Sequence, residues 1–271
     1  MKRLLIPLSM LAVLLVAAPA AASDHDGGDT GTVTVLHGVP GLDVDVYANG
    51  EILIEGFAPG DSFGPTDLPA ADYAITVFPA GEDPEGDPAI SADVTVPAGV
   101  NATAIAHLDA DGAPTLSVFV NDVSQIAAGE TRLVVRHTAA FGPVDVLAND
   151  GAVIEGLTNP NESDALSVPA DTYSVAVTAA GDPDTEALRA DLDLEEGTAY
   201  FVHAIGDPGA ETFDVLIQTV DGLHTAPAEV HTGTGGLAAD GGSAVPAAAT
   251  AAVIGLLGLA LATRPVLARR R

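Results

Sequence analysis

Residues 44–56 read VDVYANGEILIEG, and one hundred positions later residues 144–156 read VDVLANDGAVIEG. The agreement runs without a gap from His37 to Ala80-Gly81, which return as His137 and Ala180-Gly181. An ungapped register of this length predicts two tandem copies of one domain. Any functional residue should therefore be sought in both copies.

Each copy consists of short β-prone runs separated by turn residues, with no helical period. The strands predicted in the first copy are residues 33–37, 44–48, 52–54, 73–78, 90–96, 102–108 and 116–120. Asn49-Gly50 lies between two of these runs and favours a tight hairpin. About seven short strands in roughly 95 residues are typical of an immunoglobulin-like sandwich. The predicted fold class is all-β, with two tandem immunoglobulin-like β-sandwich domains.

Strand parity assigns side chains to faces, because successive residues of a strand point to opposite sides. In the second copy Arg132 and Arg136 fall on one face of their strand, and His137 falls on the other. We expect the arginines to face solvent and His137 to point inward. Asp45 alternates with two valines and is expected to point outward.

Two tyrosines recur at the start of an alternating strand, each after a Pro-Ala turn. They are Tyr73 and Tyr173. Their position predicts corner tyrosines, whose hydroxyl groups bond to nearby backbone.

Both ends of the chain carry export and membrane signals. Residues 1–22 combine a basic start, an apolar run and an A-x-A-like site, which is the pattern of a secretory signal peptide. Residues 245–263 contain no charged side chain, and a helix of this length would span roughly 28 Å. The arginine-rich residues 264–271 follow, as expected for a cytoplasmic tail. The sequence predicts a single-pass protein of the cell membrane with an extracellular repeat region.

The repeat region is expected to divide into a first domain at 32–124 and a second domain at 131–222. Residues 223–244 are rich in Gly, Ala and Thr and have little apolar periodicity. This composition is typical of a flexible spacer, so we expect a stalk between the second domain and the transmembrane helix.

The exported part is strongly acidic. Between Asp24 and Asp240 the chain holds 38 acidic and only three basic residues, a formal charge of −35. Such a surface repels polyanions, which excludes nucleic acid as a partner. Two explanations remain open: a solvated surface suited to a salty medium, or carboxylates that bind calcium. The chain contains no cysteine, so disulfides, thiol catalysis and cysteine-based zinc sites are excluded.

The repeated strand and turn motifs of the two copies resemble those of the domain-of-unknown-function 4397 family. Its members are exported and surface proteins, and the domain often occurs in tandem. The first copy carries the pattern as His37-Gly38-Val39-Pro40, Val44-Asp45-Val46-Tyr47, Asn49-Gly50 and Leu68-Pro69-Ala70 with Tyr73. In the second copy the proline after His137 is missing, Leu147 replaces the tyrosine, and Asn149-Asp150-Gly151 suggests a wider turn. The resemblance covers residues 32 to about 222. It implies a location and a fold, and no established activity.

Four histidines are the strongest candidate site residues. From their predicted strands, His37 and His107 in the first copy correspond to His137 and His203 in the second. Two histidines on strands of one sandwich are a candidate metal site, because imidazole is a common ligand. A carboxylate from Asp45 or Asp145 would complete the ligand set, although strand parity opposes this. In the alternative interpretation each histidine is a buried polar residue bonded to backbone or to its partner, and no cofactor is bound.

Enzymatic motifs are absent from the sequence. It has no G-x-S-x-G nucleophile turn, no HExxH, no P-loop and no GxGxxG in a β-α-β setting. The leading hypothesis is a non-enzymatic cell-surface protein that displays two β-sandwich repeats for envelope structure or adhesion, with the membrane and other envelope components as its partners. The alternative is an extracellular binding module for a cation or a small ligand.

Overall fold

The computed structural model describes residues 30–224, which form sixteen β-strands and one short 3₁₀ turn, η1 (Pro208–Ala210). The predicted signal peptide (1–22), nearly all of the stalk (223–244), the transmembrane helix (245–263) and the basic tail (264–271) lie outside the described residues. Within residues 30–224, no helix has the length and apolar character needed to cross a bilayer.

The first copy folds into two four-stranded sheets, with strand orders β4-β1-β7-β8 and β3-β2-β5-β6. Its strands are β1 (Thr30–His37), β2 (Val44–Ala48), β3 (Glu51–Phe57), β4 (Ser62–Pro69), β5 (Ala71–Pro79), β6 (Ile90–Val96), β7 (Asn101–Leu108) and β8 (Pro114–Val120). Apolar side chains of both sheets meet in one core cluster. This confirms an all-β sandwich.

The second copy repeats this arrangement, with sheets β12-β9-β15-β16 and β11-β10-β13-β14. Its strands are β9 (Glu130–His137), β10 (Val144–Ala148), β11 (Gly151–Leu157), β12 (Leu166–Pro169), β13 (Thr172–Ala179), β14 (Asp182–Asp193), β15 (Ala199–Ile205) and β16 (Asp214–Val220). The segment between the two sets of strands runs from residue 121 to residue 129.

The strand order differs from that of an immunoglobulin constant domain. There the first and second strands are neighbours in one sheet. Here β1 and β2 lie in opposite sheets, and β1 is central, antiparallel to β4 and parallel to β7. The second domain has the same parallel pair in β9 and β15. The sandwich architecture was therefore predicted correctly, and the immunoglobulin strand order was not.

One strand of the first domain, β4, was not among the predicted runs. Its sequence contains Gly64 and Pro65, which weaken a strand pattern. Both are tolerated because β4 is an edge strand that pairs only with β1. Gly64 approaches β1 so closely that an added Cβ would lie 2.7 Å from the carbonyl oxygen of Val33. The close approach explains the glycine.

The hairpin predicted at Asn49-Gly50 is present, and both residues have positive φ, at 52° and 79°. These values are typical of a two-residue turn that follows the twist of its strands. In the second copy Asn149 and Asp150 take the same conformation, with φ at 49° and 65°, and β11 begins at Gly151. The expected wider turn is therefore wrong, because Asp150 adopts the left-handed conformation at the position of Gly50.

Asp45 is not solvated as parity suggests, since only 6% of its surface is exposed. Its carboxylate accepts hydrogen bonds from the backbone N–H of Gly56 at 2.7 Å and of Gly81 at 2.9 Å. Asp145 bonds the equivalent glycines in the second copy, at 2.7 and 2.8 Å. Asp45 does point away from the core, in which Val44 and Val46 pack, as parity predicts. It is buried because the register shift between β2 and β3 and the turn at Gly81 bring backbone N–H groups over its carboxylate. The recurring Val-Asp-Val and Ile-Glu-Gly motifs therefore belong together, because the aspartate carboxylate of the first accepts a hydrogen bond from the glycine N–H of the second.

The corner tyrosines are confirmed. Tyr73 donates from its hydroxyl to the carbonyl oxygen of Pro69 at 2.9 Å, and Tyr173 donates to that of Pro169 at 3.0 Å. Each bond ties the start of β5 or β13 to the end of the preceding strand. The Pro-Ala-x-x-Tyr repeat thus encodes a turn.

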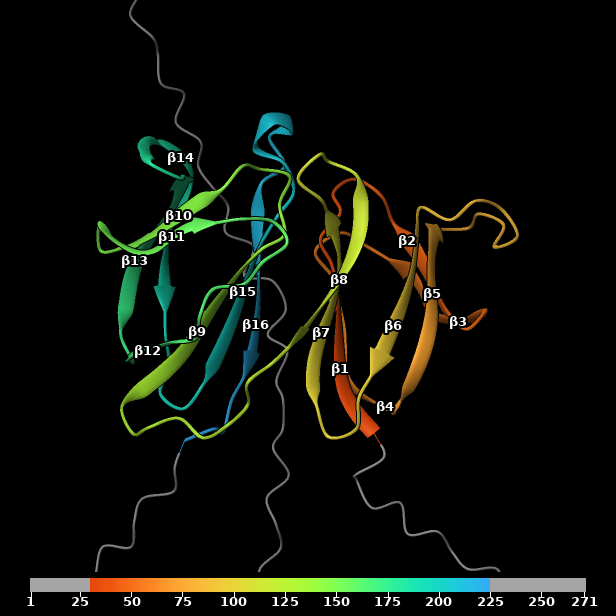
Figure 1. The fold of residues 1–271 in the computed structure, drawn as a ribbon, viewed down its shortest axis with the longest axis horizontal. Helices are drawn as coiled ribbons and strands as arrows, with labels where there is room; N and C mark the ends of the chain where they lie inside the picture. The colour runs from red at the N-terminus through yellow and green to blue at the C-terminus, as the bar shows by residue number, and fades with distance from the viewer. Residues whose placement is uncertain (1–29, 225–271) are drawn as a thin grey trace, which may run out of the picture.

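The two domains pack against each other through sheet faces (Figure 1). The sheets that contain β1 and β9 lie side by side, and the other two sheets lie on the outside. Direct contacts join the inner pair: Thr103 of β7 donates to Gln218 of β16 at 2.6 Å, and the Phe119 ring lies 6.1 Å from that of His203. The repeat region is therefore a stack of four sheets.

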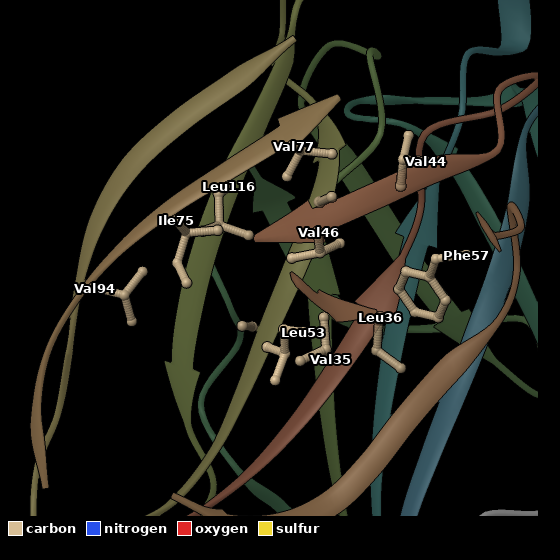
Figure 2. Close-up of a pocket in the computed structure, with 12 residues that line it drawn as sticks. Val35, Leu36, Val44, Val46, Leu53, Phe57, Ile75, Val77, Val94 and Leu116 are labelled. Carbon is tan, nitrogen blue, oxygen red and sulfur yellow. The ribbon is translucent and has the colours of Figure 1, made fainter. Parts of the chain in front are cut away.

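The core of the first domain contains a small cavity of about 40 Å³. Figure 2 shows the apolar side chains that line it, among them Val46, Ile75 and Leu116. They come from both sheets of the sandwich. An apolar cavity of this kind represents lost dispersion contacts.

The cavity follows from a difference between the two copies. Ala102 and Ala104 of β7 occupy the register positions that Tyr200 and Val202 hold in β15. Tyr200 is buried in the core of the second domain and Val202 packs against it. The first domain therefore has less side-chain volume at this point in its core.

We predict that Ala104→Val, which copies the second domain, stabilises the protein by about 1 kcal/mol, because two added methyl groups fill part of the cavity. The reverse change, Val202→Ala, should destabilise it by roughly 2 kcal/mol. Urea unfolding followed by circular dichroism measures both. A loss of stability in Ala104→Val would show that the space cannot accept these atoms.

Candidate functional site

His37 and His137 are buried, as predicted, at the ends of β1 and β9. Each bonds through Nε2 to a loop carbonyl, that of Leu42 at 2.8 Å and that of Gly142 at 2.9 Å. Burial lowers the pKa of both imidazoles below the ordinary value of 6.5, so at neutral pH each is an uncharged donor. The interpretation as buried polar residues bonded to backbone is confirmed for this pair.

His107 and His203 are not equivalent residues. Across the parallel pairs, Leu36 lies opposite Ile105, and Arg136 lies opposite His203. His203 therefore occupies the position of Ile105, and His107 occupies that of Ile205. The predicted correspondence is wrong because the second copy is two residues shorter between its fifth strand and its seventh, which moves the offset from 100 to 98.

The two histidines of each copy do not converge. His37 alternates onto the face of Val35, which packs in the sandwich core. His107 lies on the face of Ile105, which packs against Ile205 of the other domain. The same parity separates His137 from His203. In the part of the chain that the structure describes, no three metal-ligating side chains are grouped to hold an ion.

His107 and His203 instead lie at the interface between the domains. His107 bonds to the carbonyl oxygen of Leu108 and to the hydroxyl of Ser117, both at 2.8 Å. His203 is fully buried against the ring of Phe119. The candidate site is therefore at this interface and is formed by side chains from both domains.

Arg136 is the centre of this interface, although parity predicted that it would face solvent. The prediction failed because parity separates two faces without showing what covers each, and the first domain covers this one. No part of the Arg136 side chain is exposed. Its guanidinium carbon lies 4.6 Å from the ring centroid of Phe119 and 4.7 Å from that of Phe201. The cation is thus held between two aromatic rings, one from each domain.

Polar partners from both domains complete the site. Nε of Arg136 donates to the Glu162 carboxylate at 2.9 Å, and Nη2 donates to Oδ1 of Asn121 at 2.8 Å. Burial lowers the pKa of Arg136 and Glu162 opposes this shift, while the high ordinary value keeps the group charged. We call Arg136, Glu162, Asn121, Phe119 and Phe201 the Arg136 cluster.

An apolar cluster lies beside it. Leu36, Ile105 and Phe119 of the first domain pack with Ile205 of the second, and Leu216 lies against them. Close approach of the sheets requires Gly38, since an added Cβ would lie 2.8 Å from Cγ2 of Ile205. The interface therefore combines desolvated apolar contact with a satisfied buried charge.

The connection between the domains is also fixed. Ile126 is buried in a cluster with Val134 and Phe201 of the second domain. Its backbone N–H donates to the carbonyl of Leu223 at 2.7 Å, and Nη1 of Arg132 donates to the carbonyls of Asp122 and Ser124. Sequence reasoning placed Arg132 in solvent, and it holds the linker instead.

The fold and this interface define a class: a duplicated β-sandwich whose two copies are joined face to face. The sequence profile described as "Domain of unknown function (DUF4397)" matches residues 31–146 and 140–232. The protein is a member of that family, with two tandem copies of the domain. The structural break between the copies falls earlier than the profile's overlap, between the end of β8 and the start of β9.

Other comparisons add no functional information. No curated protein matches the chain. Among solved structures, "The Bacillus anthracis TIE protein" is 13% identical with a TM-score of 0.20, and the match covers 65% of this chain and 33% of that one. The chain thus spans about a third of that protein. A likeness at this level carries no argument about activity.

We predict that Arg136→Ala lowers the free energy of unfolding by about 3 kcal/mol, because it leaves a cavity between the two rings and removes a hydrogen-bond donor from the buried Asn121. Arg136→Leu should lose roughly half as much, since an apolar side chain still fills the space between the rings. Leucine is the residue at this position in the first domain, as Leu36. Urea unfolding measures both changes, and equal stability of the two variants would contradict this account.

Proposed function

We propose that this protein is a non-enzymatic cell-surface protein that holds two packed β-sandwich domains outside the membrane, for envelope structure or adhesion. The observation that carries the proposal is the order of segments: an export-type start (1–22), two domains, a Gly/Ala/Thr-rich stretch (223–244), and an apolar segment (245–263) followed by arginines. This order is the one expected of an exported domain pair with a single membrane anchor, and it supports the proposal.

The packing of the domains supports a display role. A protein that must hold a binding or structural surface at a fixed place gains from a rigid body, since less conformational freedom is lost on contact. The Arg136 cluster and the anchored Ile126 linker provide this rigidity. Two domains on a free linker would not.

The charge distribution supports an outward-facing surface in a saline medium. Each of the three basic side chains of the described region is committed to an ion pair within the chain: Arg132 with Asp122, Arg136 with Glu162, and Arg189 with Glu186 and Asp150. The remaining acidic groups give the surface a strong negative field, which salt screens. This disfavours polyanions as partners and suits display among other envelope components.

Deletion of residues 245–271 should release the protein into the medium, because the anchor is lost while the export signal remains. Immunoblotting of cell and medium fractions measures this. The matched control deletes only Arg269, Arg270 and Arg271, which leaves the apolar segment intact and should keep the protein on cells. Continued cell association of the longer deletion would overturn the anchoring proposal.

A further inference from the structure

His203 lies within the interface between the domains and has an unusual environment. Its side chain is fully buried, and Nδ1 has no hydrogen-bond partner in the described region. The other ring nitrogen, Nε2, lies 3.5 Å from Nη1 of Arg136. A buried imidazole with one unpartnered nitrogen is costly, so its protonation state bears directly on the interface.

The neighbour of Nε2 fixes the tautomer. A guanidinium can only donate hydrogen bonds, so Nε2 must be the acceptor in this contact and the ring proton must sit on Nδ1. A proton added to Nε2 would turn the acceptor into a donor facing another donor. It would also place a second positive charge beside Arg136.

The groups that face His203 offer little compensation for such a charge. From β9 it meets Arg136, from β7 His107, and from β8 the Phe119 ring. On β16 the residue opposite is Leu216. The nearest carboxylate in this network, that of Glu162, already pairs with Nε of Arg136. A protonated His203 would therefore share a single carboxylate with an existing cation.

We propose that His203 is an acid-sensitive lock on the interface: the two domains stay packed while its imidazole is neutral and separate when it takes up a proton. The separated form exposes both the ring and Arg136, its neighbour on the adjacent strand of the same domain, to water, which solvates and screens the two charges. Protonation therefore favours separation.

The direction of the pH dependence follows from the pKa. Burial, then the Arg136 charge, then His107, lower the pKa of His203 well below 6.5 in the packed form. The separated form has an ordinary pKa of about 6.5 and binds more protons. Packing is therefore fully stable above about pH 6.5 and weakens as pH falls toward the lowered value. His107, whose pKa is also lowered by burial, adds to the effect.

The test uses thiol labelling, since the chain has no cysteine of its own. Leu36→Cys places a thiol on the interface, where it reacts only when the domains separate. Val77→Cys places one in the core of the first domain, where it reacts only on unfolding. Labelling rates of the full chain in mild detergent, from pH 7.5 to 5.5, are divided by those of a free thiol to give protection factors.

We expect protection of the Leu36→Cys thiol to fall below pH 6.5, with His203 contributing up to about tenfold per pH unit, while the Val77→Cys thiol stays protected. Adding His203→Gln, which keeps an acceptor for Arg136 and cannot titrate, should remove that contribution. Adding His203→Ile, the residue of the first domain, should do the same. Adding His37→Gln, on the opposite face of its sheet, should not.

Three results would overturn the lock. The first is protection at Leu36→Cys that does not depend on pH. The second is loss of protection at both thiols together, which would mean unfolding. The third is an unchanged slope in both His203 variants. Because labelling is measured on purified protein, these results are independent of where the protein resides in the cell.

Discussion

A guanidinium group removed from water must keep partners for its charge and its donors, and Arg136 obtains them only when both domains are in place. The second domain supplies Phe201 and Glu162, and the first supplies Phe119 and Asn121. Removing one partner of a buried charge is far more costly than never burying the charge. The arrangement of the four sheets therefore depends on this contact, which penalises any other relative position of the domains.

The positions that recur and the positions that differ between the two copies have different structural roles. Motifs that recur, such as Asp45 and Asp145, serve each sandwich by itself, because they close bulges and turns within one domain. Positions on the inner faces have diverged instead. Leu36 of the first domain corresponds to Arg136 of the second, and Ile105 corresponds to His203. If both copies carried arginine at this position, two cations would be buried at the interface, and if both carried leucine there would be none. The difference between Leu36 and Arg136 gives a single buried cation with partners.

Much of the fold could be predicted from the sequence. The strands with alternating patterns, the Asn49 hairpin and the corner tyrosines all follow from local chemistry that adjacent residues display. The edge strand β4 was missed because Gly64 and Pro65 interrupt its strand pattern. Its pairing with β1 joins residues about 30 positions apart, which local sequence does not display. The immunoglobulin strand order was wrong for the same reason, since run lengths do not reveal which strands become neighbours.

The candidate site was harder to predict. Parity correctly separated His137 from Arg136, but it could not show that the first domain covers the Arg136 face. One signal was available: Arg136 is one of only three basic residues between Asp24 and Asp240, a region with 38 acidic ones, and it directly follows the apolar run Leu133-Val134-Val135 in its strand. The equivalence of His107 and His203 failed because the ungapped register ends after Gly81, and a two-residue difference moves every later strand.

The central claim is that the two sandwiches form one rigid body held by a buried charge. Residual dipolar couplings of backbone amides in β1–β8 and in β9–β16 test it most directly, because each domain reports its own alignment tensor. The account predicts a single tensor at pH 7.5 that fits both domains in the orientation described. Two tensors of different magnitude or orientation would show that the domains move independently, and would contradict it.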